Sequence, residues 1–192
     1  METYFTSDIH AHHRNICKFT DRKDFTTQEQ HDDWLINIWN SQVDKGSKVF
    51  HLGDFSFSHN KEEVLTLVKK LKGQKFFIKG NHDRSEMLDF LKENNAIQNW
   101  FDYKEIKIGG IHTCLFHFPI VSWNKQHHGA WHLHGHSHGN YEGQGKILDV
   151  GLDSAYKIFG EHRFFTEQDI EQIMQSKEIQ IADNHRKDKS ID

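Results

Sequence analysis

The stretch Phe76-Phe77-Ile78-Lys79-Gly80-Asn81-His82-Asp83 decides the fold, because it joins a hydrophobic run to a group of polar side chains across one glycine. Residues 76–78 predict a short buried strand. Gly80 allows the chain to turn sharply where this strand ends. In an α/β sheet, side chains at the carboxyl ends of strands gather at one edge, and ligands bind there. The stretch therefore predicts an α/β protein whose site lies in the loops after its strands.

The same pattern recurs at four other strands, predicted over residues 4–6, 48–52, 112–116 and 130–134. The side chains that follow them and can bind a metal ion are Asp8 with His10, Asp54, His117, and His136 with His138. Each piece alone is a weak signal, but five such strand ends in one chain are hard to reconcile with chance. Alternation along a strand would also place His136 and His138 on the same side, as two ligands of one site require.

The remaining elements fit one α/β domain over residues 1–176, followed by a polar tail over 177–192. Hydrophobic spacing predicts helices over 28–43, 60–72 and 85–94. Thr26 and Glu29 have capping-box spacing before the first helix, and Thr166 and Asp169 have it before a last one. Two glycines at 109–110 predict a hairpin, and residues 146–150 predict a further strand. The alternation of strands and helices predicts partly parallel pairing, to which the hairpin adds antiparallel strands.

Composition excludes several classes of protein. The formal net charge is -4, and no stripe of Lys and Arg is present, so the chain is not expected to coat long nucleic acid. No apolar stretch is long enough to span a membrane, the start does not resemble a signal peptide, and two cysteines cannot form a disulfide framework. We therefore expect a cytoplasmic protein.

The candidate ligands also indicate the kind of metal. Carboxylate, amide and imidazole groups without thiolate suit Mn, Fe, Zn, Ni or Co rather than a structural zinc site built from cysteine. Seven ligands are more than one tetrahedral ion takes, whereas two ions that share a carboxylate would use them all. Such ion pairs lie about 3.5–4 Å apart and act on phosphate esters.

Read in order, these residues resemble the five motifs of the calcineurin-like metallophosphoesterase superfamily, and in particular its small bacterial and phage members. The motifs are Ser7-Asp8-Ile9-His10, Gly53-Asp54, Gly80-Asn81-His82-Asp83, His117 and Gly135-His136-Ser137-His138. They run from residue 7 to residue 138, about two thirds of the chain.

The resemblance implies a fold of two sheets packed face to face and flanked by helices. It also implies two divalent cations, with Mn as the first choice. Asp8, His10, Asp54 and His138 would bind one ion, and Asp54, Asn81, His117 and His136 the other, with Asp54 as the bridge. His82 would be the catalytic acid and, with Asn81, a contact to the phosphate. Many relatives carry an acidic residue shortly after the bridging aspartate that orients this histidine, but Asp54-Phe55-Ser56-Phe57 contains none. Asp83 is the acidic candidate adjacent to His82, and we include it among the catalytic residues.

The expected reaction is hydrolysis of a phosphate ester by a hydroxide that bridges the metals, with a proton from His82 for the leaving oxygen. Arg84 and His13 are candidates to contact the phosphate; the alternatives are a solvated charge for Arg84 and a helix-start contact for His13. A phosphodiesterase acting on nucleotides or short nucleic acid is the first choice, and a phosphomonoesterase the second. A non-catalytic metal-binding protein and a small nucleic-acid-binding module are the alternatives from other classes.

Several residues remain open between support of the site and ordinary packing. His134 could lie behind the metal ligands or be a hydrogen-bonded core ring. Trp123 and Trp131 could stack on a base or form a hydrophobic wall. Asp149 and Asp153 could support the site or stabilise a turn.

Overall fold

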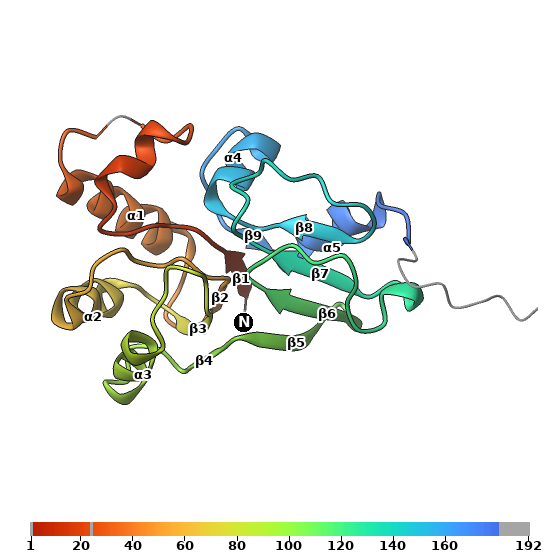
Figure 1. Cartoon of the computed structure of the whole chain (residues 1–192), viewed down its shortest axis with the longest axis horizontal. Coiled ribbons are helices and arrows are strands. Elements are labelled where there is room, and N and C mark those ends of the chain that lie inside the picture. Colours follow the sequence, from red (N-terminus) through yellow and green to blue (C-terminus); the bar gives the residue numbers. More distant parts are fainter. Residues whose placement is uncertain (1, 24, 181–192) are drawn as a thin grey trace, which may run out of the picture.

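Two β-sheets pack face to face in the computed structural model, which describes residues 2–23 and 25–180 (Figure 1). The strands of the first sheet, in spatial order, are β4 (Asn99–Phe101), β3 (Gln74–Ile78), β2 (Lys48–His51), β1 (Thr3–Thr6) and β9 (Phe165–Thr166). Those of the second are β5 (Tyr103–Ile108), β6 (Ile111–Phe116), β7 (Trp131–His134) and β8 (Ile147–Asp149). The helices are η1 (Arg14–Lys18), α1 (Gln28–Gln42), α2 (Lys61–Lys70), α3 (Ser85–Glu93), η2 (Gln126–His128), α4 (Leu152–Phe159) and α5 (Glu167–Gln175).

Both sheets are mixed, and their parallel parts position the site. Strands β1 to β4 pair in parallel, and only β9 runs antiparallel in the first sheet. In the second sheet β5 and β6 form the predicted hairpin, and β6, β7 and β8 pair in parallel. The loops after β1, β2 and β3 therefore leave one sheet at the same edge. The loops after β6 and β7 leave the other sheet in the same way.

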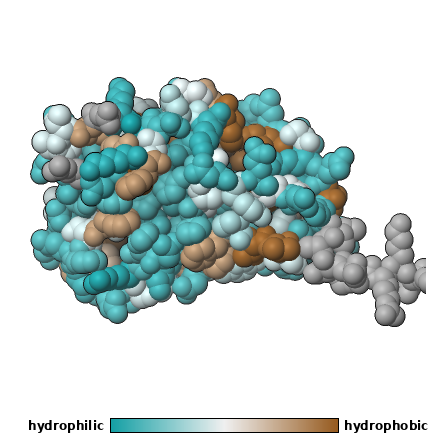
Figure 2. All heavy atoms as spheres, turned by 45° about the horizontal axis from the view of Figure 1, so that its top comes forward, coloured by the Kyte–Doolittle hydropathy of each residue, from teal (hydrophilic) through white to brown (hydrophobic). Residues whose placement is uncertain are grey.

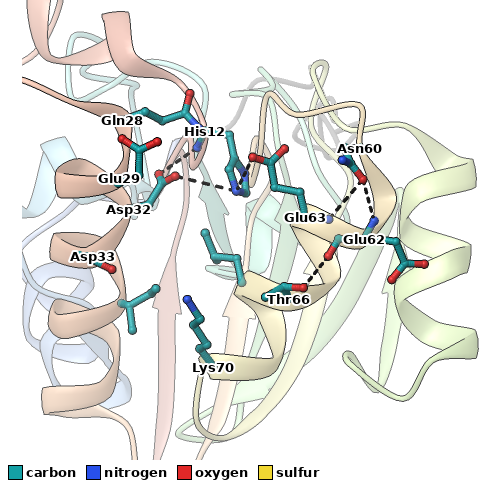
Figure 3. Close-up of a pocket in the computed structure, with 12 residues that line it drawn as sticks. His12, Gln28, Glu29, Asp32, Asp33, Asn60, Glu62, Glu63, Thr66 and Lys70 are labelled. Atoms are coloured by element: carbon teal, nitrogen blue, oxygen red, sulfur yellow. Dashed lines mark hydrogen bonds and ion pairs between the residues drawn. The ribbon is translucent and has the colours of Figure 1, made fainter.

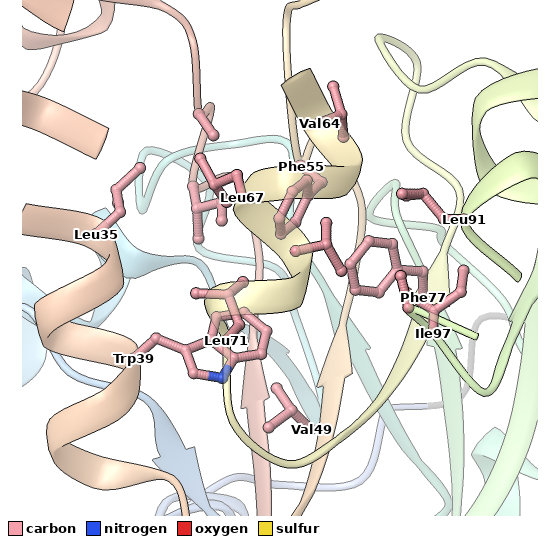
Figure 4. Close-up of a cluster of buried hydrophobic side chains, with 14 of the residues drawn as sticks. Leu35, Trp39, Val49, Phe55, Val64, Leu67, Leu71, Phe77, Leu91 and Ile97 are labelled. Atoms are coloured by element: carbon pink, nitrogen blue, oxygen red, sulfur yellow. The ribbon is translucent and has the colours of Figure 1, made fainter. Parts of the chain in front are cut away.

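The hydrophobic core has two main parts. One lies between the first sheet and helices α1, α2 and α3, where Trp39 is almost fully buried and donates a hydrogen bond from Nε1 to the carbonyl of Lys72 (Figure 4). The other lies between the sheets, with Phe5 and Phe50 facing Leu115 and Leu133. Each fully buried side chain of this size contributes about 1.5–3 kcal/mol. The sheet edges that carry the site loops are thus held by packing on both sides.

The predicted elements are found, with corrections at their ends. The cap of α1 is Thr27 rather than Thr26: its side chain accepts a hydrogen bond from the backbone N–H of Gln30, and the Thr26 hydroxyl bonds to the Gln30 side chain. The capping box of Thr166 and Asp169 is confirmed. Strands β4 and β9 and helix α4 were not predicted, because two or three extended residues and a helix of only two turns give little periodic signal.

The surface carries no large hydrophobic area on the face shown in Figure 2, where hydrophobic residues form small groups on a mostly hydrophilic face. Among the described residues, no helix is both long and apolar enough to cross a membrane. Most of the predicted C-terminal tail, residues 181–192, lies outside the described residues.

Candidate metal centre

The predicted ligands lie in loops whose backbone is in an unusual conformation. Five of them have positive φ angles between 48° and 68°: Asp8, His10, Asp54, His136 and His138. Side chains other than glycine rarely adopt this left-handed conformation, and such strain tends to gather at functional sites. It is retained here because the flanking strands and the core fix both ends of each loop.

The first group of ligand atoms comes from Asp8, His10 and His138, which lie within 4.8 Å of one another. Nε2 of His10 is 3.2 Å from Nε2 of His138, and these atoms lie 3.8 Å and 4.0 Å from Oδ1 of Asp8. That oxygen is buried and has no hydrogen-bond partner, whereas Oδ2 accepts a bond from the backbone N–H of His136. Burial raises the pKa of Asp8 to about 7.

The second group comes from Asp54, His117 and His136, again within 4.8 Å. The side-chain oxygen of Asn81 lies between the two rings, 2.9 Å from Nε2 of His117 and 3.0 Å from Nδ1 of His136. Nε2 of His117 also lies 3.5 Å from Oδ2 of Asp54. Burial disfavours a charged His117, but the hydrogen bond to Asp54 and the charges of Asp8 and Asp54 outweigh it and raise the pKa of His117 to about 9.

Both groups fit a cation. In the first group, a buried carboxylate oxygen without a donor and two imidazole nitrogens that face each other are costly without a partner. In the second group, the buried ring of His117 points Nε2 at oxygens of Asn81 and Asp54. A divalent ion would satisfy them together, and the donor set of oxygen and imidazole suits first-row transition metals. The hydrogen bond between Asp8 and His136 places the two groups side by side. The structure thus contains two candidate metal-binding groups.

His82 lies beside these groups, and its position is fixed by hydrophobic packing and by the backbone. Its side chain is 46% exposed, with Nε2 3.9 Å from Oδ2 of Asp54. The backbone N–H of His82 donates to Oδ1 of Asp54, and the ring centroid is 4.4 Å from that of Phe57. Phe57 therefore packs against the ring of His82 within the segment where relatives carry an acid.

Relatives of this chain were found by sequence. A gene 66 protein of Mycobacterium phage D29 is 32% identical, over 81% of this chain and 89% of its own length. An uncharacterised protein of Methanocaldococcus jannaschii is 33% identical, over 72% and 70%. No family model matches the sequence.

Solved structures share the fold. A protein of unknown function from Aquifex aeolicus superimposes with a TM-score of 0.68 at 23% identity, over 90% of this chain and 98% of its own. A structure described as a novel archaeal phosphodiesterase gives a TM-score of 0.52 at 21% identity, over 86% and 99%. The chain has the fold of the calcineurin-like metallophosphoesterases, and by sequence it belongs to one family with the gene 66 protein of phage D29. At these identities the structural likeness concerns the fold and not the activity.

The side chain of Asp83 contacts the backbone of two loops of the candidate centre, and its predicted catalytic role stays a prediction. Its carboxylate accepts hydrogen bonds from three backbone N–H groups: those of Asp54 at 2.8 Å, Phe55 at 3.0 Å and Gly80 at 2.9 Å. It thereby ties the loop after β2 to the loop after β3. Adjacency to His82 in the sequence did not reveal this, because consecutive residues of a loop point in different directions.

His136 and His138 also correct the expectation drawn from strand alternation. Strand β7 ends at His134, and both histidines follow it in left-handed conformations. His136 joins the group of Asp54, and His138 joins that of Asp8. They belong to different groups, as the family resemblance implied.

The two candidate phosphate contacts are placed differently. The ring of His13 stacks on Phe57 at 4.0 Å and lies 5.8 Å from the ring of His10, so it borders the first group. Arg84 is exposed at the start of α3, with Nη2 3.4 Å from Nε2 of His59. No contact connects Arg84 to either metal-binding group among the described residues.

Among the residues whose role the sequence left undecided, most pack in the interior. Trp123 and Trp131 are buried, so neither offers a face for a base to stack on. His134 is buried, and its Nδ1 contacts the carbonyl of Gly135. Asp149 supports the last motif directly: it accepts hydrogen bonds from the Ser137 hydroxyl and from the backbone of Gly139 and Gly151.

A groove on the helical side of the molecule lies apart from the candidate centre. Its cavity of about 440 Å³ lies between α1 and α2 and is lined by acidic residues that include Asp32 and Glu63 (Figure 3). His12 reaches it: its backbone N–H donates to Asp32, and its Nδ1 contacts the Ser56 hydroxyl. None of the predicted site residues lines this groove. The contacts of His12 with Asp32 and Ser56 hold the loop that carries His10.

Proposed function

We propose that this protein is a phosphoesterase that depends on two divalent metal ions, and that its substrate is a phosphodiester in a nucleotide or short nucleic acid. The observation that carries the proposal is the pair of adjacent ligand groups, one of which contains a buried oxygen of Asp8 that has no hydrogen-bond donor. Asp8, His10 and His138 would hold one ion, and Asn81, His117 and His136 the other. Asp54 would bridge them, and Mn is the first metal to test.

The chemistry of this arrangement suits phosphate esters. Bound cations would activate water as a nucleophile and neutralise the charge on the phosphate oxygens. Asp54 is suited to its bridging role because its pKa lies below the ordinary value: burial opposes ionisation, but the contact with His117 and the backbone N–H of His82 outweigh it. The carboxylate is therefore ionised at neutral pH.

His82 would act as the general acid. Its ring is partly exposed and lies next to Asp54, so Nε2 can reach the oxygen of a leaving group. Proton donation of this kind typically contributes 10²–10⁴-fold to the rate. His13, whose ring also stacks on Phe57, would contact the phosphate. Asp83 would act by positioning Asp54 and the loop that carries His82.

Diesters come first for two reasons. The archaeal neighbour in fold is described as a phosphodiesterase, and the compact chain leaves little room for recognition of a large protein substrate. A phosphomonoesterase is the second candidate. Because the metal chemistry is the same for both, only substrates distinguish them.

The test is a matrix of metals and substrates. The metal-free protein is reconstituted with Mn, Ni, Zn or Mg and assayed on p-nitrophenyl phosphate, bis-p-nitrophenyl phosphate, cyclic nucleotides and oligonucleotides. We expect turnover that needs metal, is lost in Asp54→Ala and is faster on diesters. Faster turnover of monoesters would favour the second candidate. If the metal-loaded protein turns over none of these substrates, the proposal that it is a phosphoesterase is refuted.

Two esters that differ in their leaving group test the role of His82 as general acid separately. His82→Ala should lose 10²–10⁴-fold on an alkyl phosphodiester and much less on a p-nitrophenyl ester, whose leaving group departs without a proton. His128→Ala, which removes an exposed ring before β7, is the control. An equal loss on both esters, with metal content unchanged, would show that His82 does not supply the proton.

A further inference from the structure

A buried arginine joins the first and last metal motifs. Arg22 lies between η1 and α1, and its side chain is fully buried. Nη1 donates to the carbonyl of Ile9 at 2.7 Å, and Nη2 donates to the carbonyl of Asp8. The guanidinium group therefore holds the strained backbone that presents Asp8 and leads into His10.

The other side of the same guanidinium group holds Asp153 on α4. Nε donates to Oδ1 at 2.8 Å and Nη2 to Oδ2 at 2.9 Å, a bidentate pair. Oδ2 of Asp153 also lies 2.7 Å from Nδ1 of His138. Because a carboxylate can only accept, Nδ1 of His138 carries a proton, and in the neutral ring the lone pair of Nε2 lies on the side of His10 and Asp8.

In the part of the chain that the structure describes, no such carboxylate contacts the histidines of the second ligand group. Nδ1 of His117 contacts the carbonyl of Leu52 at 2.8 Å, and Nδ1 of His136 faces the amide oxygen of Asn81. His136 is exposed, whereas Asp8 and His10 are buried. The support from Arg22 and Asp153 is thus confined to one of the two groups.

We propose that Arg22 and Asp153 are positioning residues that set the metal affinity of the Asp8, His10 and His138 group, while the other group is largely independent of them. Asp153 fixes the ring of His138 and its tautomer. Arg22 balances the buried charge of Asp153, which would otherwise be costly, and holds the backbone at Asp8 and Ile9 to the same point. The inference rests on the proposed function only in that both require metal ions at these groups.

The experiment is a calorimetric titration of the metal-free protein with Mn²⁺, together with an NMR measurement on the histidine rings. We expect wild type to bind two ions. In Asp153→Asn the affinity for one ion should fall 10–100-fold, and the affinity for the other should change less than about threefold. Arg22→Lys keeps the charge but loses the bidentate geometry, so it should weaken the same ion by a smaller factor.

The matched control is a second arginine–aspartate pair, for which the described residues show no contact with a candidate ligand. Arg163 contacts Asp169 at 2.7 Å with similar two-point geometry, and Asp169→Asn should leave both affinities unchanged. In ¹H–¹⁵N spectra of the metal-free wild type, His138 should show its proton on Nδ1, and Asp153→Asn should weaken that preference. These spectra also report whether each variant is folded.

The outcomes separate the two claims. If Asp153→Asn lowers the affinity for both ions equally, or lowers neither affinity, the positioning role is overturned and the proposed function stays intact. A wild-type protein that binds no ion would overturn both.

Discussion

Asp83 offers the sharpest test of how the site is held together. Replacing it with alanine removes the acceptor of three backbone hydrogen bonds, from Asp54, Phe55 and Gly80. At about 1 kcal/mol of net stability for each bond, the loss is about 3 kcal/mol. For a chain of this size, 1 kcal/mol shifts the midpoint of thermal unfolding by about 2–4 °C, so Asp83→Ala should melt roughly 6–12 °C lower.

Asparagine at the same position should give a graded result. Oδ2 of Asp83 accepts hydrogen bonds from the backbone N–H groups of Asp54 and Gly80, and Oδ1 accepts one from that of Phe55. An asparagine with its oxygen at the place of Oδ2 keeps two of these bonds, but its amide nitrogen faces the N–H of Phe55 and leaves that donor without an acceptor. The loss should therefore be about 2 kcal/mol, or about 4–8 °C.

Differential scanning calorimetry of the metal-free variants measures this series. The control is Asp102→Ala, which removes an exposed carboxylate between β4 and β5 and should melt like wild type. If Asp83→Ala melts together with Asp102→Ala, the three bonds do not hold the loops. If Asp83→Asn loses activity while its unfolding temperature and metal content stay unchanged, the catalytic role first predicted for Asp83 would be supported.

Two further predictions concern stability and the shape of the site. Burial opposes ionisation of Asp169, but hydrogen bonds from Thr166 and the contact with Arg163 outweigh it and hold the pKa below its ordinary value of 3.8. A depressed pKa adds stability that is fully present above the ordinary pKa and is lost as the pH falls through the lowered one. Asp169→Asn should therefore cost about 1 kcal/mol in urea unfolding at pH 7 and progressively less as the pH falls below that ordinary pKa, and a cost that stays constant with pH would contradict this. A Cβ at Gly80 would overlap the carboxylate and backbone nitrogen of Asp54, whereas one at Gly46 meets nothing within 4 Å. Gly80→Ala should therefore cost about 1–3 kcal/mol of stability and weaken metal binding in a calorimetric titration. Gly46→Ala is the control, and equal metal affinities of the two variants would refute the close fit at Gly80.

The strand ends were predictable because hydrophobic runs and the residues that follow them are local features of the sequence. A residue directly after a buried strand must emerge at the edge of the sheet, so the loops that carry Asp8, Asp54 and His117 could be named in advance. The family resemblance then divided the ligands between two groups, and the structure has the same division for His136 and His138.

The supporting contacts were not predictable in this way. Arg22 lies in a segment without periodic pattern, and its partners at positions 8, 9 and 153 meet only in the folded chain. Strand alternation failed for His136 and His138 because the strand ends before them and the backbone turns left-handed. Phe57 gave no chemical signal at all, since an aromatic ring that packs on histidines cannot be told from a core residue by spacing alone.

The most direct test of the metal centre is a crystal structure of the protein grown with Mn²⁺ and recorded near the Mn absorption edge. The account predicts two anomalous peaks about 3.5–4 Å apart, with the carboxylate of Asp54 between them, Asp8, His10 and His138 around one, and Asn81, His117 and His136 around the other. A map without a peak beside Asp54, or with these side chains turned away from the ions, would contradict it.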